Sequence, residues 1–209
     1  MADVREKMKR EPLQSKRVIL CEGTDEYDLL MWLRDDKKWI PEDVEILNAK
    51  GRDNLPTRLK DLRYESGGSD VQLVCVVLDA EERQGLDEAL INDLKAQANA
   101  AKLQMMIEEL PNSTDTGSME TLVRNGCDAN TQAYQCADQW EQCLSKVDDA
   151  RTQAQKDKAW AHVWLAGQGK IYSRIGYAFT KNQQVREKLS HLQTHFEAIL
   201  NRVMSEALI

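Results

Sequence analysis

Runs of apolar residues alternate with amphipathic segments along the first half of the chain. Three runs rich in β-branched and aliphatic residues have the pattern of buried strands, and they lie at 17–21, 43–49 and 71–78. Segments with apolar residues at helical spacing predict helices at 24–36, 55–64 and 86–101. Because strands that alternate with helices form parallel sheets, we expect an α/β fold whose mostly parallel sheet is flanked by helices.

The pattern is less decisive at 103–110. Leu103, Met105 and Ile107 alternate with polar or weakly apolar residues, which favours a further strand. An extension of the preceding helix is the alternative. A polar loop rich in Pro, Asn, Ser, Thr and Asp follows at 111–117, and it marks a change in the character of the sequence.

The second half of the chain has the spacing of helices rather than strands. Helices are expected as an insertion and at the C-terminus, at 118–124, 131–146, 154–165 and 182–207. Trp140, Trp160 and Trp164 lie in these helices, and we expect them in the core or at an interface rather than as platforms for stacked bases. The chain is thereby divided into a flexible lead (1–15), an α/β core (16–117) and a helical region (118–209) that packs on the core or completes it.

Composition narrows the classes of function. A formal net charge of −7 argues against a stand-alone, tight nucleic-acid binder, but it fits an enzyme whose carboxylates bind cations, or a subunit that works with a partner. Five cysteines without a Cys-x-x-Cys pair predict reduced thiols, and three histidines make a histidine-based zinc site a poor fit. The charged N-terminus and the absence of a run of 18 apolar residues predict a cytoplasmic protein that does not span a membrane.

Carboxylates follow two of the predicted strands. Glu22 comes directly after the first strand, whereas Asp79 and Glu81 end the most hydrophobic one. Since the carboxyl ends of neighbouring parallel strands meet at one edge of the sheet, these side chains are expected to lie close together. Carboxylate oxygens suit hard divalent cations, so the sequence predicts a Mg²⁺ or Mn²⁺ site. For each of these residues taken alone, the simpler alternative is an ordinary charged residue in a solvent-exposed loop.

Two segments resemble the motifs of a known family. Residues 18–26, with the sequence VILCEGTDE, resemble the Glu-Gly-x-x-Glu motif of the TOPRIM domain in the form found in OLD-type nucleases. Residues 76–81, VVLDAE, resemble its Asp-x-Asp motif with glutamate at the second acidic position. Gly51 and the segment 117–120, GSME, resemble further features of small stand-alone TOPRIM-related proteins. The resemblance covers roughly residues 16–200.

The resemblance implies a Mg²⁺-dependent fold for phosphoryl transfer. By this carry-over Glu22 is a metal ligand or general acid/base, Asp79 and Glu81 are catalytic metal ligands, and Glu26 and Glu120 support a second ion. Glu26 and Glu120 also fit a simpler role, since a carboxylate in the first turn stabilises a helix. Gly23 and Lys170 are the candidate phosphate contacts, with an ordinary surface lysine as the alternative for Lys170.

The leading functional hypothesis is a nuclease that hydrolyses DNA or RNA, with water as the nucleophile. A role in phage defence is implied only by the likeness to OLD-type systems, whose ATPase domain this chain lacks, so an ATPase would act as a separate partner. The alternative is a non-catalytic regulatory or interaction subunit, which the acidic charge and the longer Glu81 side chain favour. A primase or topoisomerase activity fits less well, because the chain has little room for accessory domains. A homo-oligomer is possible on any of these hypotheses.

Overall fold

The computed structural model describes residues 13, 15–37, 44–65, 67–81, 86–112, 114–147, 150–170 and 172–208. The predicted flexible lead, 1–15, lies almost wholly outside these residues. Its two described members, Leu13 and Ser15, are buried. None of the helices in the described ranges is long and apolar enough to cross a membrane.

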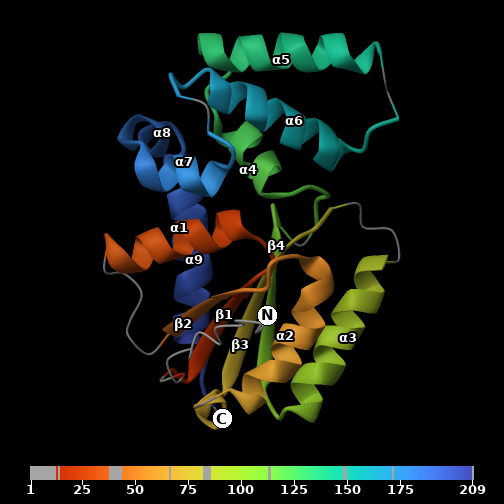
Figure 1. The fold of residues 1–209 in the computed structure, drawn as a ribbon, viewed down its shortest axis with the longest axis vertical. Helices are drawn as coiled ribbons and strands as arrows, with labels where there is room; N and C mark the ends of the chain where they lie inside the picture. Colours follow the sequence, from red (N-terminus) through yellow and green to blue (C-terminus); the bar gives the residue numbers. More distant parts are fainter. Residues whose placement is uncertain are drawn as a thin grey trace, which may run out of the picture.

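The described strands form one parallel sheet. The strands are β1 (Arg17–Cys21), β2 (Val44–Asn48), β3 (Leu73–Asp79) and β4 (Gln104–Leu110). Their order across the sheet is β2-β1-β3-β4, with every neighbouring pair parallel (Figure 1). The predicted α/β fold with a parallel sheet is therefore confirmed. β4 also shows that residues 103–110 form a strand rather than an extension of the preceding helix.

Each face of the sheet packs against its own helices. On one face, Leu20 and Val76 contribute to a core that includes α2 (Leu55–Asp61) and α3 (Leu86–Ala100). On the other face, Ile19 and Val77 contribute to a core that includes α1 (Thr24–Asp35) and α9 (Ser190–Ser205). Both faces of the central strands are covered, which explains why β3 is buried at every position and reads as a continuous apolar run.

Most of the helical region lies beyond the carboxyl-terminal edge of the sheet, whereas its last helix, α9, packs on one face (Figure 1). The helices beyond the edge are α4 (Met119–Gly126), α5 (Gln132–Ser145), α6 (Gln153–Ala166), α7 (Ile175–Lys181) and α8 (Gln183–Lys188). Trp160 and Trp164 are buried with rings 6.3 Å apart, as expected of core residues. Trp140 is exposed on α5.

The predicted single terminal helix at 182–207 is wrong, because the chain breaks at Leu189. Leu189 has φ −104° and ψ 25°, and it separates α8 from α9. Its side chain is nevertheless fully buried, in line with Val185 before it and Leu192 after it. Apolar spacing continues across the break, so the periodicity gives no sign that one residue leaves the helical conformation.

Threonine is a common N-cap residue, but Thr24 does not cap the first helix. Gly23 is the N-cap residue, and Thr24 is the first residue of α1. The Thr24 hydroxyl accepts a hydrogen bond from Asn48 Nδ2 at 3.2 Å, so it links α1 to the end of β2 instead of capping the helix. Sequence pattern alone places such boundaries only to within a residue or two.

Close packing between α1 and α7 leads to a first prediction. A Cβ atom added at Gly176 would lie 2.5 Å from the backbone oxygen of Asp25 and 2.8 Å from its Cα. Gly176→Ala is expected to destabilise the chain by roughly 1–3 kcal/mol, because backbone atoms cannot move aside cheaply. Urea unfolding measures the change. Lys181→Ala, at an exposed position of the same helix, serves as the control. Equal unfolding midpoints for both variants would contradict the close packing.

Candidate functional site

Backbone hydrogen bonds hold the carboxyl ends of β1, β2 and β3 together. The amide of Glu22 donates to Val77 O at 2.8 Å, and the amide of Gly51 donates to Glu22 O at 2.9 Å. Directly beyond these contacts, the Asp79 amide donates to Glu22 Oε2 at 3.2 Å. Glu22 and Asp79 therefore lie side by side at the end of the sheet, as their positions after neighbouring strands predicted.

Asp79 occupies the centre of this site. Its carboxylate oxygen Oδ1 accepts a hydrogen bond from the amide of Met119, the first residue of α4, at 3.0 Å. The other oxygen, Oδ2, lies 4.0 Å from Nζ of Lys158. Burial raises the pKa of Asp79 well above its ordinary value, and the negative charges of Glu26 and Glu22 raise it further. The N-terminus of α4 is a favourable place for a carboxylate because the helix dipole is positive there.

Glu26 is buried in the first turn of α1 and faces the same cluster. Its Oε2 atom has no hydrogen-bond partner in the described part of the chain, which is costly for a buried carboxylate oxygen. Burial, with the nearby charges of Asp25 and Glu22, raises the pKa of Glu26 to about 7. The absence of a side chain at Gly23 makes room for this carboxylate, since a Cβ there would lie 2.8 Å from Glu26 Oε2.

Two further carboxylates border the cluster. Glu120, in the first turn of α4, accepts a hydrogen bond from Ser118 Oγ at 2.7 Å, and its negative charge helps to raise the pKa of both Glu26 and Asp79. Asp25 accepts a hydrogen bond from the amide of Gly176 at 2.9 Å. Burial is the main cause of the raised pKa of Asp25. Asp25 was not singled out as a site residue, although it lies in the same turn as Glu22.

Glu81 lies at the outer rim of the site rather than inside it. Its backbone has a positive φ of 45° and pairs with Gly117, with its amide donating to Gly117 O at 2.6 Å. Its carboxylate oxygen Oε2 lies 3.6 Å from Nη1 of Arg52, and the same Nη1 lies 3.7 Å from Glu22 Oε2. The Glu81 side chain is 42% exposed, compared with 14% for Glu22.

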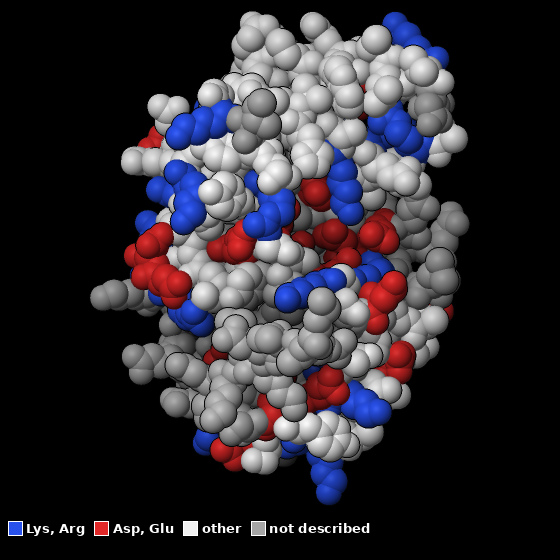
Figure 2. All heavy atoms as spheres, viewed as in Figure 1, with Lys and Arg blue, Asp and Glu red and all other residues white. Residues whose placement is uncertain are grey.

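Two cations border the carboxylates, and neither is among the site residues predicted from the sequence. Arg52 bridges Glu22 and Glu81 and donates to the backbone oxygen of Asp79 at 2.9 Å. Burial opposes the charge of Lys158, but the charges of Glu120 and Asp79 outweigh it and the pKa of Lys158 is raised. Arg52 follows β2, so the rule that located Glu22 also covers it. Lys158 lies within α6 and carries no comparable signal. On the face of the molecule drawn in Figure 2, acidic side chains lie in the middle with basic side chains around them.

Burial also raises the pKa of Glu22, while the charge of Arg52 opposes the increase. The site thus holds several carboxylates that are easier to protonate than free ones. Among the described residues, no group of three or more His, Cys, Asp and Glu side chains already has the arrangement of a metal-binding cluster. Lys170 is exposed beyond α6, and within the described chain no hydrogen bond or ion pair joins it to these carboxylates.

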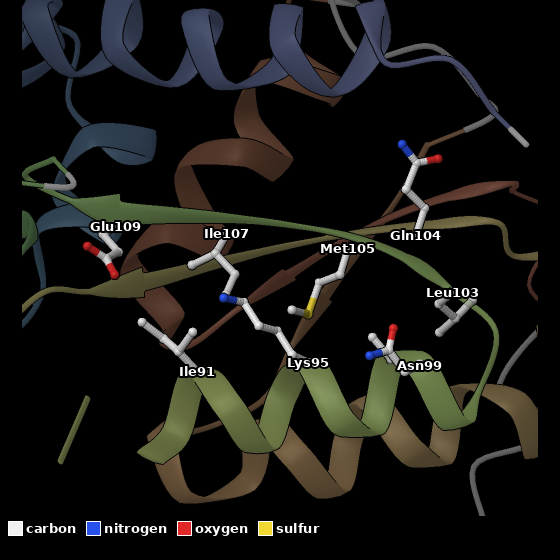
Figure 3. A pocket seen from close by; sticks show the side chains of 9 residues that line it. Ile91, Lys95, Asn99, Leu103, Gln104, Met105, Ile107 and Glu109 are labelled. Atoms are coloured by element: carbon white, nitrogen blue, oxygen red, sulfur yellow. The ribbon is translucent and has the colours of Figure 1, made fainter. Parts of the chain in front are cut away.

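A separate groove of about 570 Å³ lies between α3 and the edge strand β4 (Figure 3). Met105 and Ile107 point from β4 toward α3, and the Lys95 side chain reaches across from the helix. None of the predicted site residues lines this groove. The carboxylate cluster at the end of the sheet is therefore the site where chemistry-bearing side chains gather.

The chain is therefore an α/β protein whose parallel sheet has a cluster of buried carboxylates, the candidate site, at its carboxyl-terminal edge. Residues 16–205 match the model of a family described as a protein of unknown function, DUF3226. The chain belongs to that family. No curated protein and no solved structure matches it.

Proposed function

We propose that the chain is a TOPRIM-type nuclease that uses Mg²⁺ or Mn²⁺ to hydrolyse phosphodiester bonds in DNA or RNA. The observation that carries the proposal is the convergence of Glu22, Glu26 and Asp79 at the carboxyl edge of the sheet, where Oε2 of Glu26 has no hydrogen-bond partner among the described residues. Mutually close carboxylates repel one another and are costly to bury. A bound cation would remove that cost.

The donor set suits a hard divalent cation. Glu22, Glu26 and Asp79 offer only oxygen atoms, which Mg²⁺ and Mn²⁺ prefer, and Glu120 lies near enough to support a second ion. When bound, such a cation would polarise the phosphodiester and stabilise the charge on its leaving oxygen. Glu81 lies at the rim and would act on incoming substrate through Arg52 rather than as a central ligand.

Side chains of the protein itself would supply the other parts of the reaction. Glu22 is partly exposed and has a raised pKa, which suits a residue that accepts the proton of an attacking water. Lys158 and Arg52 border the carboxylates, where their positive charges would hold the phosphate oxygens of the substrate. Gly23, whose lack of a side chain makes room for Glu26, is the proposed phosphate contact. We further propose a cytoplasmic role, in phage defence, with a separate ATPase as partner.

Cation binding tests the site without requiring the right substrate. Titration of Mn²⁺ into the chain, followed by calorimetry, is expected to show binding that weakens about 10- to 100-fold in Glu120→Gln, because that carboxylate supports the ligands. Glu187→Gln, at an exposed position on α8, is the matched control and should bind as the wild type does. Equal affinity in wild type and Glu120→Gln would remove Glu120 from the site.

One observation favours a second candidate, a non-catalytic regulatory or interaction subunit. Arg52 lies between Glu22 and Glu81, and Lys158 approaches Asp79, so protein cations already offset part of the carboxylate charge. On this alternative the cluster is structural and the chain works through a partner. Absence of Mn²⁺ binding by the wild type, together with absence of cleavage of DNA and RNA, would favour the subunit over the nuclease.

A further inference from the structure

Two helices from distant parts of the chain contact the carboxylate of Asp79. Its Oδ1 atom accepts a hydrogen bond from the amide of Met119 at the start of α4, and its Oδ2 atom lies 4.0 Å from Nζ of Lys158 on α6. α4 and α6 pack against each other beyond the sheet (Figure 1). The surroundings of this carboxylate therefore depend on how the two helices are placed relative to each other.

A short hydrogen bond joins α4 to α6 close to the site. The hydroxyl of Thr121 donates to Oδ2 of Asp157 at 2.7 Å, and both residues are buried. Thr121 lies two residues after Met119, and Asp157 directly precedes Lys158. The bond thus links the helix that donates to Asp79 with the helix that carries Lys158.

Thr121 also fixes the backbone at the start of α4. Its Oγ1 atom accepts a hydrogen bond from the amide of Ser118 at 3.0 Å, and Ser118 is fully buried directly before Met119. The preceding residue, Gly117, has a φ of 141°, and a Cβ atom there would lie 2.5 Å from Oγ1 of Thr121. The turn that leads into α4 is therefore packed tightly against the Thr121 side chain.

Asp157 is held by further donors. It is 1% exposed, and its Oδ1 atom accepts hydrogen bonds from Nη1 of Arg124 at 3.0 Å and from Nε2 of Gln153 at 2.9 Å. Arg124 lies on α4, so its positive charge offsets the buried carboxylate and adds a second link between the two helices. Because both oxygens of Asp157 are bonded, its carboxylate cannot rotate without loss of a hydrogen bond.

We propose that Thr121 and Asp157 are positioning residues, which hold α4 and α6 where Met119 and Lys158 reach Asp79. Within the described residues, no hydrogen bond or ion pair joins either side chain to the Asp79 carboxylate, so they act through these neighbours. The inference rests on the proposed function, in which Asp79 binds a divalent cation. Residues that orient a ligand from behind commonly set the affinity for the metal.

Titration of Mn²⁺ followed by calorimetry tests the positioning role. Thr121→Val keeps the shape of the side chain but removes the hydroxyl, so the variant loses the hydrogen bonds to both helices. It is expected to bind Mn²⁺ about 10- to 100-fold more weakly than the wild type. Thr121→Ser restores the hydroxyl and is expected to regain most of the affinity.

Thr131→Val is the matched control for loss of a threonine hydroxyl. Oγ1 of Thr131 accepts from the amide of Tyr134 at 3.3 Å and donates to Asp128 O at 2.8 Å, so this variant also loses one accepted and one donated hydrogen bond, at the start of α5. It should bind Mn²⁺ as the wild type does. If Thr121→Val binds Mn²⁺ as tightly as this control, or if Thr121→Ser binds as weakly as Thr121→Val, the positioning role is wrong.

Amide hydrogen exchange separates this inference from the proposed function, because it needs no cation. The amide of Met119 is expected to exchange about tenfold faster in Thr121→Val than in wild type, and at the wild-type rate in Thr131→Val. A wild type that binds no Mn²⁺ would contradict the proposed cation site. Even then, an unchanged exchange rate of Met119 in Thr121→Val would show that Thr121 does not hold the start of α4 against Asp79.

Discussion

Replacement of Asp79 by asparagine is expected to lower the proposed metal-dependent cleavage of nucleic acid by about a hundredfold to a thousandfold while the chain stays folded. Asp79 is the residue to which the other parts of the site are connected, since it contacts Met119 of α4 and Lys158 of α6 and its amide contacts Glu22. Asparagine keeps an oxygen that can accept the Met119 hydrogen bond, but it removes the negative charge. Loss of one such electrostatic group from a preorganised site typically costs this much in rate.

The measurement is cleavage of labelled DNA and RNA in Mg²⁺ or Mn²⁺, with thermal unfolding to confirm that the variant is folded. Asp93→Asn, at an exposed position of α3, is the matched control, because it makes the same chemical change away from the site. The control should cleave at the wild-type rate. If Asp79→Asn also cleaves at that rate, the carboxylate cluster is not the catalytic site.

The nearness of Glu22 and Asp79 could be predicted because it follows from strand order alone. Both residues come directly after buried strands, and parallel strands present their carboxyl ends at one edge. The same rule could have included Arg52, which follows β2. It could not have found Lys158, because that residue reaches the site from α6, and the docking of α6 depends on contacts far apart in the sequence.

Strands and helices could be predicted where burial produces a regular spacing of apolar residues. They were harder to predict where the backbone conformation of a single residue ends or bends an element. The bounds of β1 agree with the expected strand at 17–21, because every residue after Arg17 is buried. At Leu189 the backbone leaves the helical conformation, although the side chain keeps its place in the apolar pattern. For Glu81, the sequence shows the residue type but not the positive φ, and that backbone conformation accompanies its position at the rim.

The buried Glu26 makes the stability of the chain depend on pH. Its pKa is about 7 in the folded chain, against an ordinary value of 4.5 that applies when the chain is unfolded. Between these values the folded state binds a proton that the unfolded state has lost, so stability falls as the pH rises through this window. The full difference corresponds to roughly 3 kcal/mol, because one pKa unit is about 1.4 kcal/mol. The stabilising contribution of protonated Glu26 is thus lost above about pH 7.

Glu26→Gln is expected to remove this dependence. Relative to wild type, the variant should gain about 2–3 kcal/mol in free energy of unfolding between pH 5 and pH 8, whatever fixed cost the amide imposes at both pH values. Urea unfolding at the two pH values, in the presence of a chelator, measures the gain. Glu187→Gln on the surface of α8 should show no such change. An equal difference between Glu26→Gln and wild type at both pH values would mean that Glu26 titrates normally in the folded chain. Addition of Mn²⁺ at pH 8 should stabilise the wild type more than the variant, because the cation offsets the charge that the variant lacks.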